Sequence, residues 1–229
     1  MLEVKDLRVS YGQSEVIHGI DFSTAEDETL AIMGRNGMGK TTLFKSLIGI
    51  LPASSGSIVL DGRELSKLPS HERVAAGLAY VPQGRMIFPS LTVMENIESG
   101  LETIKTKKVP DEIFELFPVL RDMRGRKGGN LSGGQQQQLA IARALVSEPK
   151  VLLLDEPTEG IQPSIIKDIA HTLNEIRRLK KISIVVSEQV LSFTMAIADR
   201  LAVIEKGKII HEEEGKSANQ EKIASYLSV

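Results

Sequence analysis

The residues best suited to chemistry form one short glycine-rich segment, GRNGMGKTT. It comprises Gly34, Arg35, Asn36, Gly37, Met38, Gly39, Lys40, Thr41 and Thr42. A glycine, four residues, a second glycine, then Lys and Thr is the spacing of loops that wrap the phosphates of a nucleoside triphosphate. Glycines let the backbone turn its N–H groups inward, and a helix beginning at Lys40 would add the positive end of its dipole. We therefore predict that Lys40 binds the β- and γ-phosphates of ATP and that the Thr41 hydroxyl binds Mg²⁺.

Two carboxylates directly follow an apolar run later in the chain. Residues 151–154 are Val-Leu-Leu-Leu, and Asp155 and Glu156 come next. A buried strand that ends in acids places them at the carboxyl edge of a parallel sheet, where ligands bind. Asp155 is predicted to hold the metal, and Glu156 to orient and deprotonate the attacking water. For either acid alone the alternative is a solvated strand end, but the phosphate-binding segment favours the chemical role.

The elements that position these residues alternate between apolar strands and helical patterns. This alternation predicts an α/β fold with a mainly parallel sheet, to which hairpins at the two ends of the chain add antiparallel strands. Strands are expected within 1–33 and at 57–60, 78–81, 151–154, 182–186, 201–204 and 209–210. Helices are expected at 40–50, 93–101, 111–117, 132–146, 164–179 and 190–198.

The segment from about residue 84 to 130 differs from the rest, because strand patterns are absent and helical patterns dominate. We predict a single domain over 1–229. Its core comprises 1–83 and 147–229, with an antiparallel β part at the N-terminus. A helical subdomain, 84–146, is inserted between strands of that core.

Composition excludes several classes of function. Lys plus Arg number 28 against 30 for Asp plus Glu, a balance that argues against a nucleic-acid partner held mainly by a general basic field and leaves a local basic patch as the alternative. The chain has no cysteine, which excludes disulfides, thiolate metal sites and cysteine nucleophiles. No apolar run approaches the ~18 residues of a membrane span, and the N-terminus lacks a signal-peptide core, so we expect the chain to stay inside the cell and out of the bilayer. The basic run at 105–108 is expected to be a solvated face.

The motif at 131–135, Leu-Ser-Gly-Gly-Gln, is called the signature segment below. Ser132 and Gln135 have the spacing of a capping box at a helix start, and the two glycines leave N–H groups exposed for an anion. Tyr11, the phosphate-binding segment, Gln83, the signature segment and the two acids occur in the order found in the ATP-binding-cassette ATPases. The chain resembles that family over essentially all its length.

The resemblance implies a P-loop NTPase fold with a RecA-like core, and it implies roles for further residues. Tyr11 would stack on adenine, and Gln83 would contact Mg²⁺ and the attacking water. The catalytic set would be Lys40, Gln83 and Glu156, and the metal set Thr41, Gln83 and Asp155. The signature residues Ser132, Gly133, Gly134 and Gln135 would meet the γ-phosphate of ATP held by a second ATPase subunit.

A narrower resemblance concerns the transported substrate. LSGGQQQQLAIARA and DEPTEGIQPSIIKDI are similar to one of the two ATPase subunits of branched-chain amino-acid-type importers, and within that group most similar to the urea type. This implies two transmembrane permease subunits, a solute-binding protein that acts indirectly, and a peripheral location on the cytoplasmic face of the membrane. Met86, Ile87 and Phe88 would then receive a coupling helix of a permease; the alternative is that they pack into the helical subdomain.

Two positions depart from the family pattern. Gln162 stands where an aspartate is usual, and we assign Glu188 to the position of a histidine that contacts the γ-phosphate. An ionised glutamate repels phosphate, so Glu188 must be protonated, turned away, or bridged by metal or water. A heterodimer with a histidine-bearing subunit would restore one complete site. The alternatives are a subunit with weak or no hydrolysis at its own site, and an ATP-binding-cassette ATPase outside transport.

Overall fold

The computed structural model describes residues 1–104 and 108–227. A six-stranded sheet in the order β10-β9-β3-β8-β7-β6 forms its centre. The strands are β3 (Thr29–Met33), β6 (Leu78–Val81), β7 (Val151–Asp155), β8 (Ser183–Glu188), β9 (Arg200–Glu205) and β10 (Lys208–Glu214). All neighbours are parallel except β10 and β9. β3, β7 and β8 are buried along their whole length, as strands covered on both faces are. The predicted mainly parallel sheet is confirmed.

A second sheet is antiparallel and lies at the N-terminus. Its order is β2-β1-β4-β5, from β1 (Leu2–Tyr11), β2 (Ser14–Thr24), β4 (Ser55–Leu60) and β5 (Arg63–Glu64). Its apolar residues and those of α1 (Lys40–Leu47) share one core cluster with side chains of the central sheet. Helix α1 contacts β1, β2 and β7, so it joins the two sheets at the point where the phosphate-binding segment ends.

Helix α1 is shorter than the predicted 40–50. It ends at Leu47, and Gly49 follows with a left-handed φ of 83°. The buried guanidinium of Arg73 donates to the carbonyls of Ser46 (2.7 Å) and Leu47 (2.9 Å), which a longer helix would use internally. A distant residue therefore sets the helix end, and the local apolar pattern does not reveal it.

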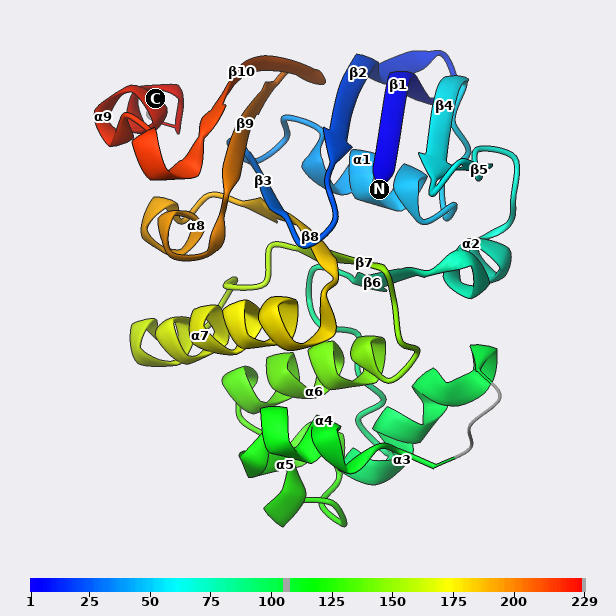
Figure 1. Cartoon of the computed structure of the whole chain (residues 1–229), viewed down its shortest axis with the longest axis vertical. Coiled ribbons are helices and arrows are strands. Elements are labelled where there is room, and N and C mark those ends of the chain that lie inside the picture. Colours follow the sequence, from blue (N-terminus) through cyan, green and yellow to red (C-terminus); the bar gives the residue numbers. More distant parts are fainter. Residues whose placement is uncertain (105–107, 228–229) are drawn as a thin grey trace.

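The regular elements between β6 and β7 are helical throughout the described residues. They are α3 (Val93–Glu98), η1 (Ser99–Thr103), α4 (Asp111–Leu116), α5 (Pro118–Asp122), η2 (Gly128–Asn130) and α6 (Gly133–Leu145). These helices gather at the end of the molecule opposite β1, β2 and β4 (Figure 1). The division into a core and a subdomain over 84–146 stays a prediction.

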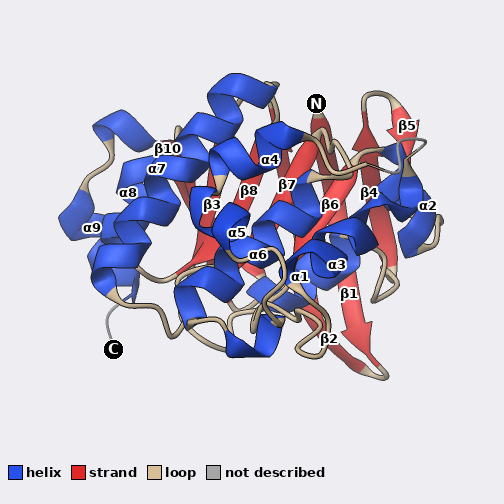
Figure 2. Ribbon diagram, turned by 90° about the horizontal axis from the view of Figure 1, so that it is seen from below, coloured by secondary structure: helices blue, strands red, loops and turns tan. Residues whose placement is uncertain are grey.

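The remaining helices are α2 (Ser70–Ala76), α7 (Pro163–Lys180), α8 (Leu191–Ile197) and α9 (Gln220–Leu227), with the short η3 (Gly215–Ser217) before the last. Helices such as α5 and α6 lie in front of the central strands in the view of Figure 2. The sequence patterns missed α2, α5 and α9, which have five to eight residues and carry too few apolar positions for a clear period.

The structure bears on the basic run and on membrane spans. Of the basic run 105–108, residues 105–107 lie outside the described residues, and Lys108 is exposed. Within the described part of the chain, no helix combines the length and apolar character that crossing a bilayer needs.

Candidate functional site

The phosphate-binding segment links the end of β3 to the start of α1, as predicted. Gly37 and Gly39 adopt left-handed φ values of 80° and 106°, which side chains rarely tolerate. At Gly34 a Cβ would lie 2.6 Å from the Ile204 carbonyl oxygen, so a strand of the central sheet also excludes a side chain there. These glycines therefore leave a loop whose backbone is exposed to a ligand.

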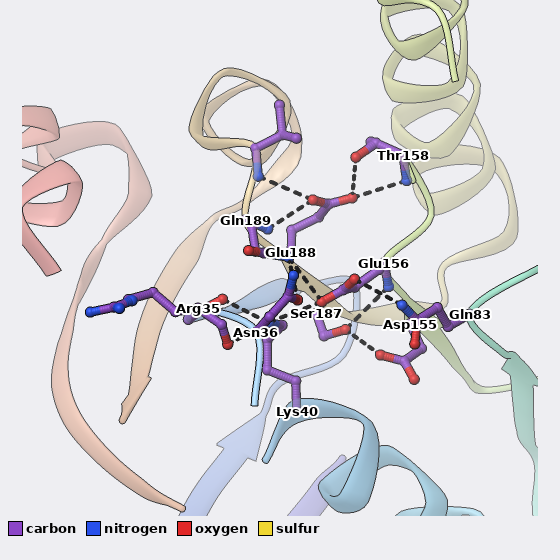
Figure 3. Close-up of polar contacts among 12 residues, drawn as sticks. Arg35, Asn36, Lys40, Gln83, Asp155, Glu156, Thr158, Ser187, Glu188 and Gln189 are labelled. Atoms are coloured by element: carbon purple, nitrogen blue, oxygen red, sulfur yellow. Dashed lines mark hydrogen bonds and ion pairs between the residues drawn. The ribbon is translucent and has the colours of Figure 1, made fainter. Parts of the chain in front are cut away.

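A pocket of about 190 Å³ opens at this loop. Its lining consists of Val16, Asn36, Gly37, Gly39, Lys40, Thr41, Thr42, Gln83 and Glu156. The Lys40 ammonium is buried and donates to the carbonyls of Gly34 (2.6 Å) and Arg35 (3.0 Å). The Arg35 side chain points away from the cluster (Figure 3). The pocket thus joins residues of the phosphate-binding segment to Gln83 and Glu156, which are distant in the sequence.

Asp155 ends β7 and lies deeply buried beside this pocket. Its carboxylate accepts hydrogen bonds from the hydroxyls of Ser187 (2.6 Å), Tyr80 (3.2 Å) and Thr41. Burial raises the pKa of Asp155 above its ordinary value, although these hydroxyls oppose the shift. Thr41 and Asp155, two of the three predicted metal ligands, therefore meet directly.

This donor set fits Mg²⁺. A hydroxyl and a carboxylate, with the Gln83 amide nearby, are hard oxygen ligands of the kind that Mg²⁺ takes together with phosphate oxygens. Among the described residues no group of three His, Cys, Asp or Glu side chains forms a metal site of its own. A metal here would depend on the nucleotide for the rest of its ligands.

Glu156 lies at the centre of the polar cluster (Figure 3). Its Oε1 forms an ion pair with Lys40 Nζ at 3.0 Å, and its Oε2 accepts from the Gln83 side-chain amide at 3.2 Å. Its backbone has a φ of 48°, a left-handed conformation that a non-glycine residue adopts at an energetic cost. Its N–H donates to the Ser187 carbonyl (3.0 Å), which supports this conformation. The turn aims the carboxylate into the pocket.

Glu188 does not face this pocket, which corrects the assignment made from the sequence. Its carboxylate is buried and turned toward Thr158, and Gln189 lies beside the phosphate-binding segment instead. The Gln189 side-chain amide donates to Asn36 Oδ1 (2.8 Å) and Glu156 Oε1 (3.3 Å). Gln189 lies just beyond the end of β8, so its direction depends on the fold and is not given by the sequence pattern. Of the three arrangements considered for Glu188, the structure has the one turned away.

The signature segment begins α6 with the predicted capping box. The Ser132 N–H donates to Gln135 Oε1 (2.9 Å), and the Gln135 N–H donates to Ser132 Oγ (3.4 Å). At Gly134 a Cβ would lie 2.5 Å from Ile165 Cγ2 of α7, so this glycine is required for helix packing. At Gly133 the nearest atoms, of Arg85, are 3.4 Å away. Neither the signature residues nor Tyr11, which is half exposed, line the phosphate pocket among the described residues.

A separate, mostly apolar groove of about 870 Å³ runs beside the loop that follows Gln83. Met86 and Phe88 line it and are 67% and 48% exposed, and the Arg143 guanidinium lies 5.3 Å from the centre of the Phe88 ring. Ile87 instead packs against the helical core. Ile87 therefore follows the packing alternative, whereas the docking of a permease helix at the exposed Met86 and Phe88 stays a prediction.

Comparison with known proteins identifies the family. The family model described as ABC transporter matches residues 17–159. The chain belongs to the ABC transporter family. This segment contains the phosphate-binding loop, the signature segment and both acids, so the chain is an ABC ATPase and hydrolyses ATP.

Curated ABC relatives of several systems align with nearly the whole chain. The high-affinity branched-chain amino acid transport ATP-binding protein BraG of Pseudomonas aeruginosa is 38% identical, with 94% of this chain and 93% of the relative covered. The probable branched-chain amino acid transport ATP-binding protein LivF of Archaeoglobus fulgidus is 35% identical, covering 91% and 90%. The lipopolysaccharide export system ATP-binding protein LptB of Haemophilus influenzae is 33% identical, covering 92% and 89%.

Solved ABC cassettes have the same fold. A nucleotide-free ATP-binding cassette from an ABC transporter superposes with a TM-score of 0.85 at 26% identity, covering 98% of this chain and 95% of that one. The ADP conformation of the cassette MJ1267 gives 0.82 at 27% identity, covering 99% and 94%. The predicted P-loop NTPase fold of the ABC ATPase type is thereby confirmed.

Proposed function

We propose that this ABC ATPase binds ATP with Mg²⁺ in the phosphate pocket and hydrolyses it with Glu156 as general base. The supporting observation is that Lys40, Thr41, Gln83 and Glu156, from three separate segments, line one pocket, with Asp155 beside it. Lys40 and the backbone N–H groups of the glycine loop hold the β- and γ-phosphates. Thr41, Asp155 and Gln83 would hold Mg²⁺, which would supply positive charge against the negative charge that develops on the phosphates.

The ion pair between Lys40 and Glu156 implies an exchange of partners during the reaction. In the structure the Glu156 carboxylate neutralises the Lys40 ammonium, a task that the phosphates of ATP perform in the bound state. Binding of ATP releases Glu156, which then accepts a proton from the attacking water, while Gln83 orients that water. Tyr11, exposed at the end of β1, stacks on the adenine.

The signature segment serves a second subunit in this proposal. Ser132, Gly133, Gly134 and Gln135 lie apart from the pocket of their own chain, so they contact the γ-phosphate of ATP bound to a partner ATPase. We propose that the partner is a different ATPase subunit, which makes a heterodimer with two unequal sites. The side chain beside this chain's pocket is the Gln189 amide, and the Glu188 carboxylate is turned away. The ATP site on this chain therefore keeps a hydrogen-bond donor. The two ATP sites of the heterodimer then differ less in activity than a glutamate beside the phosphate would imply.

The transport role rests on the relatives and on the groove. BraG and LivF are named for branched-chain amino acid transport, and LptB for lipopolysaccharide export. We propose uptake of branched-chain amino acids or urea, with urea supported only by the motif details at 131–144 and 155–169. One of two permease subunits docks in the groove at Met86 and Phe88, a solute-binding protein acts from the far side, and the chain lies on the cytoplasmic face of the membrane.

Purification of the assembled complex tests this function. A tagged chain should co-purify with two permeases and a second ATPase, and the reconstituted complex should hydrolyse ATP faster when solute-binding protein and substrate are added. Leucine and urea, assayed separately, distinguish the two substrate classes. Recovery of a complex without membrane subunits, or stimulation by neither substrate, would contradict the importer proposal.

A further inference from the structure

Glu188 is a buried acid that the proposed chemistry does not use. Its side chain is the last on β8 and is 2% exposed. Oε1 accepts from the N–H (3.0 Å) and the hydroxyl (2.6 Å) of Thr158, and Oε2 accepts from the N–H groups of Gln189 (2.8 Å) and Val190 (3.1 Å). A buried carboxylate is costly unless its oxygens are satisfied, and here both are.

The two segments that Glu188 joins both lead to the phosphate pocket. Thr158 belongs to the turn that starts at Glu156 and continues to the exposed Glu159 and Gly160. On the other side, Gln189 carries the amide that bonds Asn36 and Glu156. Glu188 therefore links the turn that aims the general base to the residue whose amide lies beside that base (Figure 3).

The type of side chain matters for this link. Every bond to Glu188 comes from a donor, and three of those donors are backbone N–H groups that cannot reverse their direction. Only a carboxylate accepts on both of its ends. A glutamine of the same shape would accept on one end and present an NH₂ group to N–H donors on the other, which would loosen one of the two segments.

We infer that Glu188 is a positioning residue that holds Gln189 against the phosphate pocket, so that the Gln189 amide can donate to the terminal phosphate of ATP. The inference rests on the proposed nucleotide site and assigns a task within it. Gln189 is the residue that touches the nucleotide, and Glu188 acts through it. A merely structural Glu188 would stabilise the fold without affecting how the pocket distinguishes ATP from ADP.

Nucleotide affinities of the isolated full-length chain separate these roles without any measurement of turnover. Binding of ADP and of the non-hydrolysable analogue AMP-PNP, both with Mg²⁺, would be compared by calorimetry for wild type, Glu188→Gln, Gln189→Ala and the double variant. Because a hydrogen bond to a charged phosphate oxygen is stronger than one between neutral groups, we expect each single variant to bind AMP-PNP at least roughly tenfold more weakly. ADP affinity should change less than about twofold. The double variant should match Gln189→Ala, because Glu188 acts through that residue.

Substitutions of Thr158 supply matched controls, because they change only its hydroxyl hydrogen bond to Glu188. Thr158→Val removes the hydroxyl bond to Glu188 and keeps the shape and the N–H bond, so it should weaken AMP-PNP binding by about threefold. Thr158→Ser keeps the hydroxyl and should behave as wild type. Thermal unfolding of every variant verifies folding, and Thr158→Val keeps the test valid if Glu188→Gln is unstable.

Three results would overturn the inference. They are equal losses of ADP and AMP-PNP affinity in Glu188→Gln, losses that multiply in the double variant, and unchanged AMP-PNP binding in Gln189→Ala. Failure of the proposed nucleotide site would look different, because the wild-type chain would then bind neither nucleotide.

Discussion

In the phosphate pocket, Lys40 and Glu156 are buried and paired with each other, whereas Ser132 of the signature segment is exposed and forms the capping-box hydrogen bonds of α6. Residues from four segments of the chain line the pocket. No residue of the signature segment is among the described residues that line it. In the proposed dimer, the signature segment of one subunit would face the phosphate pocket of the other. A variant in one of these two regions should therefore leave the other intact.

The largest effect is expected from Glu156→Gln in the pocket. The amide retains the shape of the side chain but accepts no proton, and loss of a general base typically lowers the rate about 10²–10⁴-fold. ATP binding should be retained, and strengthened if the ion pair to Lys40 competes with phosphate. Hydrolysis by the assembled complex and equilibrium binding of ATP measure the two effects. A variant that hydrolyses ATP near the wild-type rate would remove Glu156 from its proposed role.

Assembly should respond strongly to Phe88, which belongs to neither half-site. Phe88→Glu places a charge in the apolar groove and should weaken association with the permeases at least about tenfold, as loss of an aromatic anchor does. ATP binding by the isolated chain should be unchanged, and its melting temperature should fall by a few degrees at most. Phe88→Leu is the control that keeps an apolar side chain. Unfolding of Phe88→Glu under conditions where wild type is stable would instead make Phe88 a core residue.

The two signature glycines should separate packing from ligand contact. Gly134→Ala forces a methyl group against Ile165, and overpacking of this kind costs about 1–3 kcal/mol. For a chain of this size each kcal/mol lowers the melting temperature by about 2–4 °C. Gly133→Ala, with more space, should leave the melting temperature nearly unchanged. Equal melting temperatures for the two variants would contradict a packing role for Gly134.

The smallest effect concerns Asp155 and pH. Burial raises its pKa, so the charged form is disfavoured in the folded chain, and the free energy of unfolding falls as pH rises through that raised pKa. Asp155→Asn lacks this fall and should melt on the order of 2 °C higher than wild type at neutral pH in EDTA. The surrounding hydroxyls can rotate to satisfy the new amide. The difference in melting temperature between the two proteins should vanish in acid. An Asp155→Asn variant that melts below wild type at neutral pH would contradict the prediction.

Local motifs were predictable from the sequence, and side-chain directions were not. The glycine spacing at 34–39 and the capping box at Ser132 and Gln135 depend on consecutive residues, so their geometry follows from the pattern. The direction of Glu188 depends on how β8 lies against β7, and the early end of α1 depends on Arg73, a residue far along the chain. The packing requirement at Gly134 arises from α7 and is equally invisible to a motif. The roles of the site residues in binding and catalysis stay predictions.

The most direct test of a shared site is Ser132→Arg, assayed for steady-state ATP hydrolysis in the assembled complex. This change is outside the chain's own pocket, so ATP binding by the isolated chain should be unchanged, yet hydrolysis should fall at least about tenfold because the partner's γ-phosphate loses its contact. Lys40→Ala, measured alongside, should leave a larger residual rate if the two sites are unequal and the dimer still closes. Equal losses from the two variants would contradict the heterodimer with unequal sites. Wild-type hydrolysis by the Ser132→Arg complex would contradict the shared site itself.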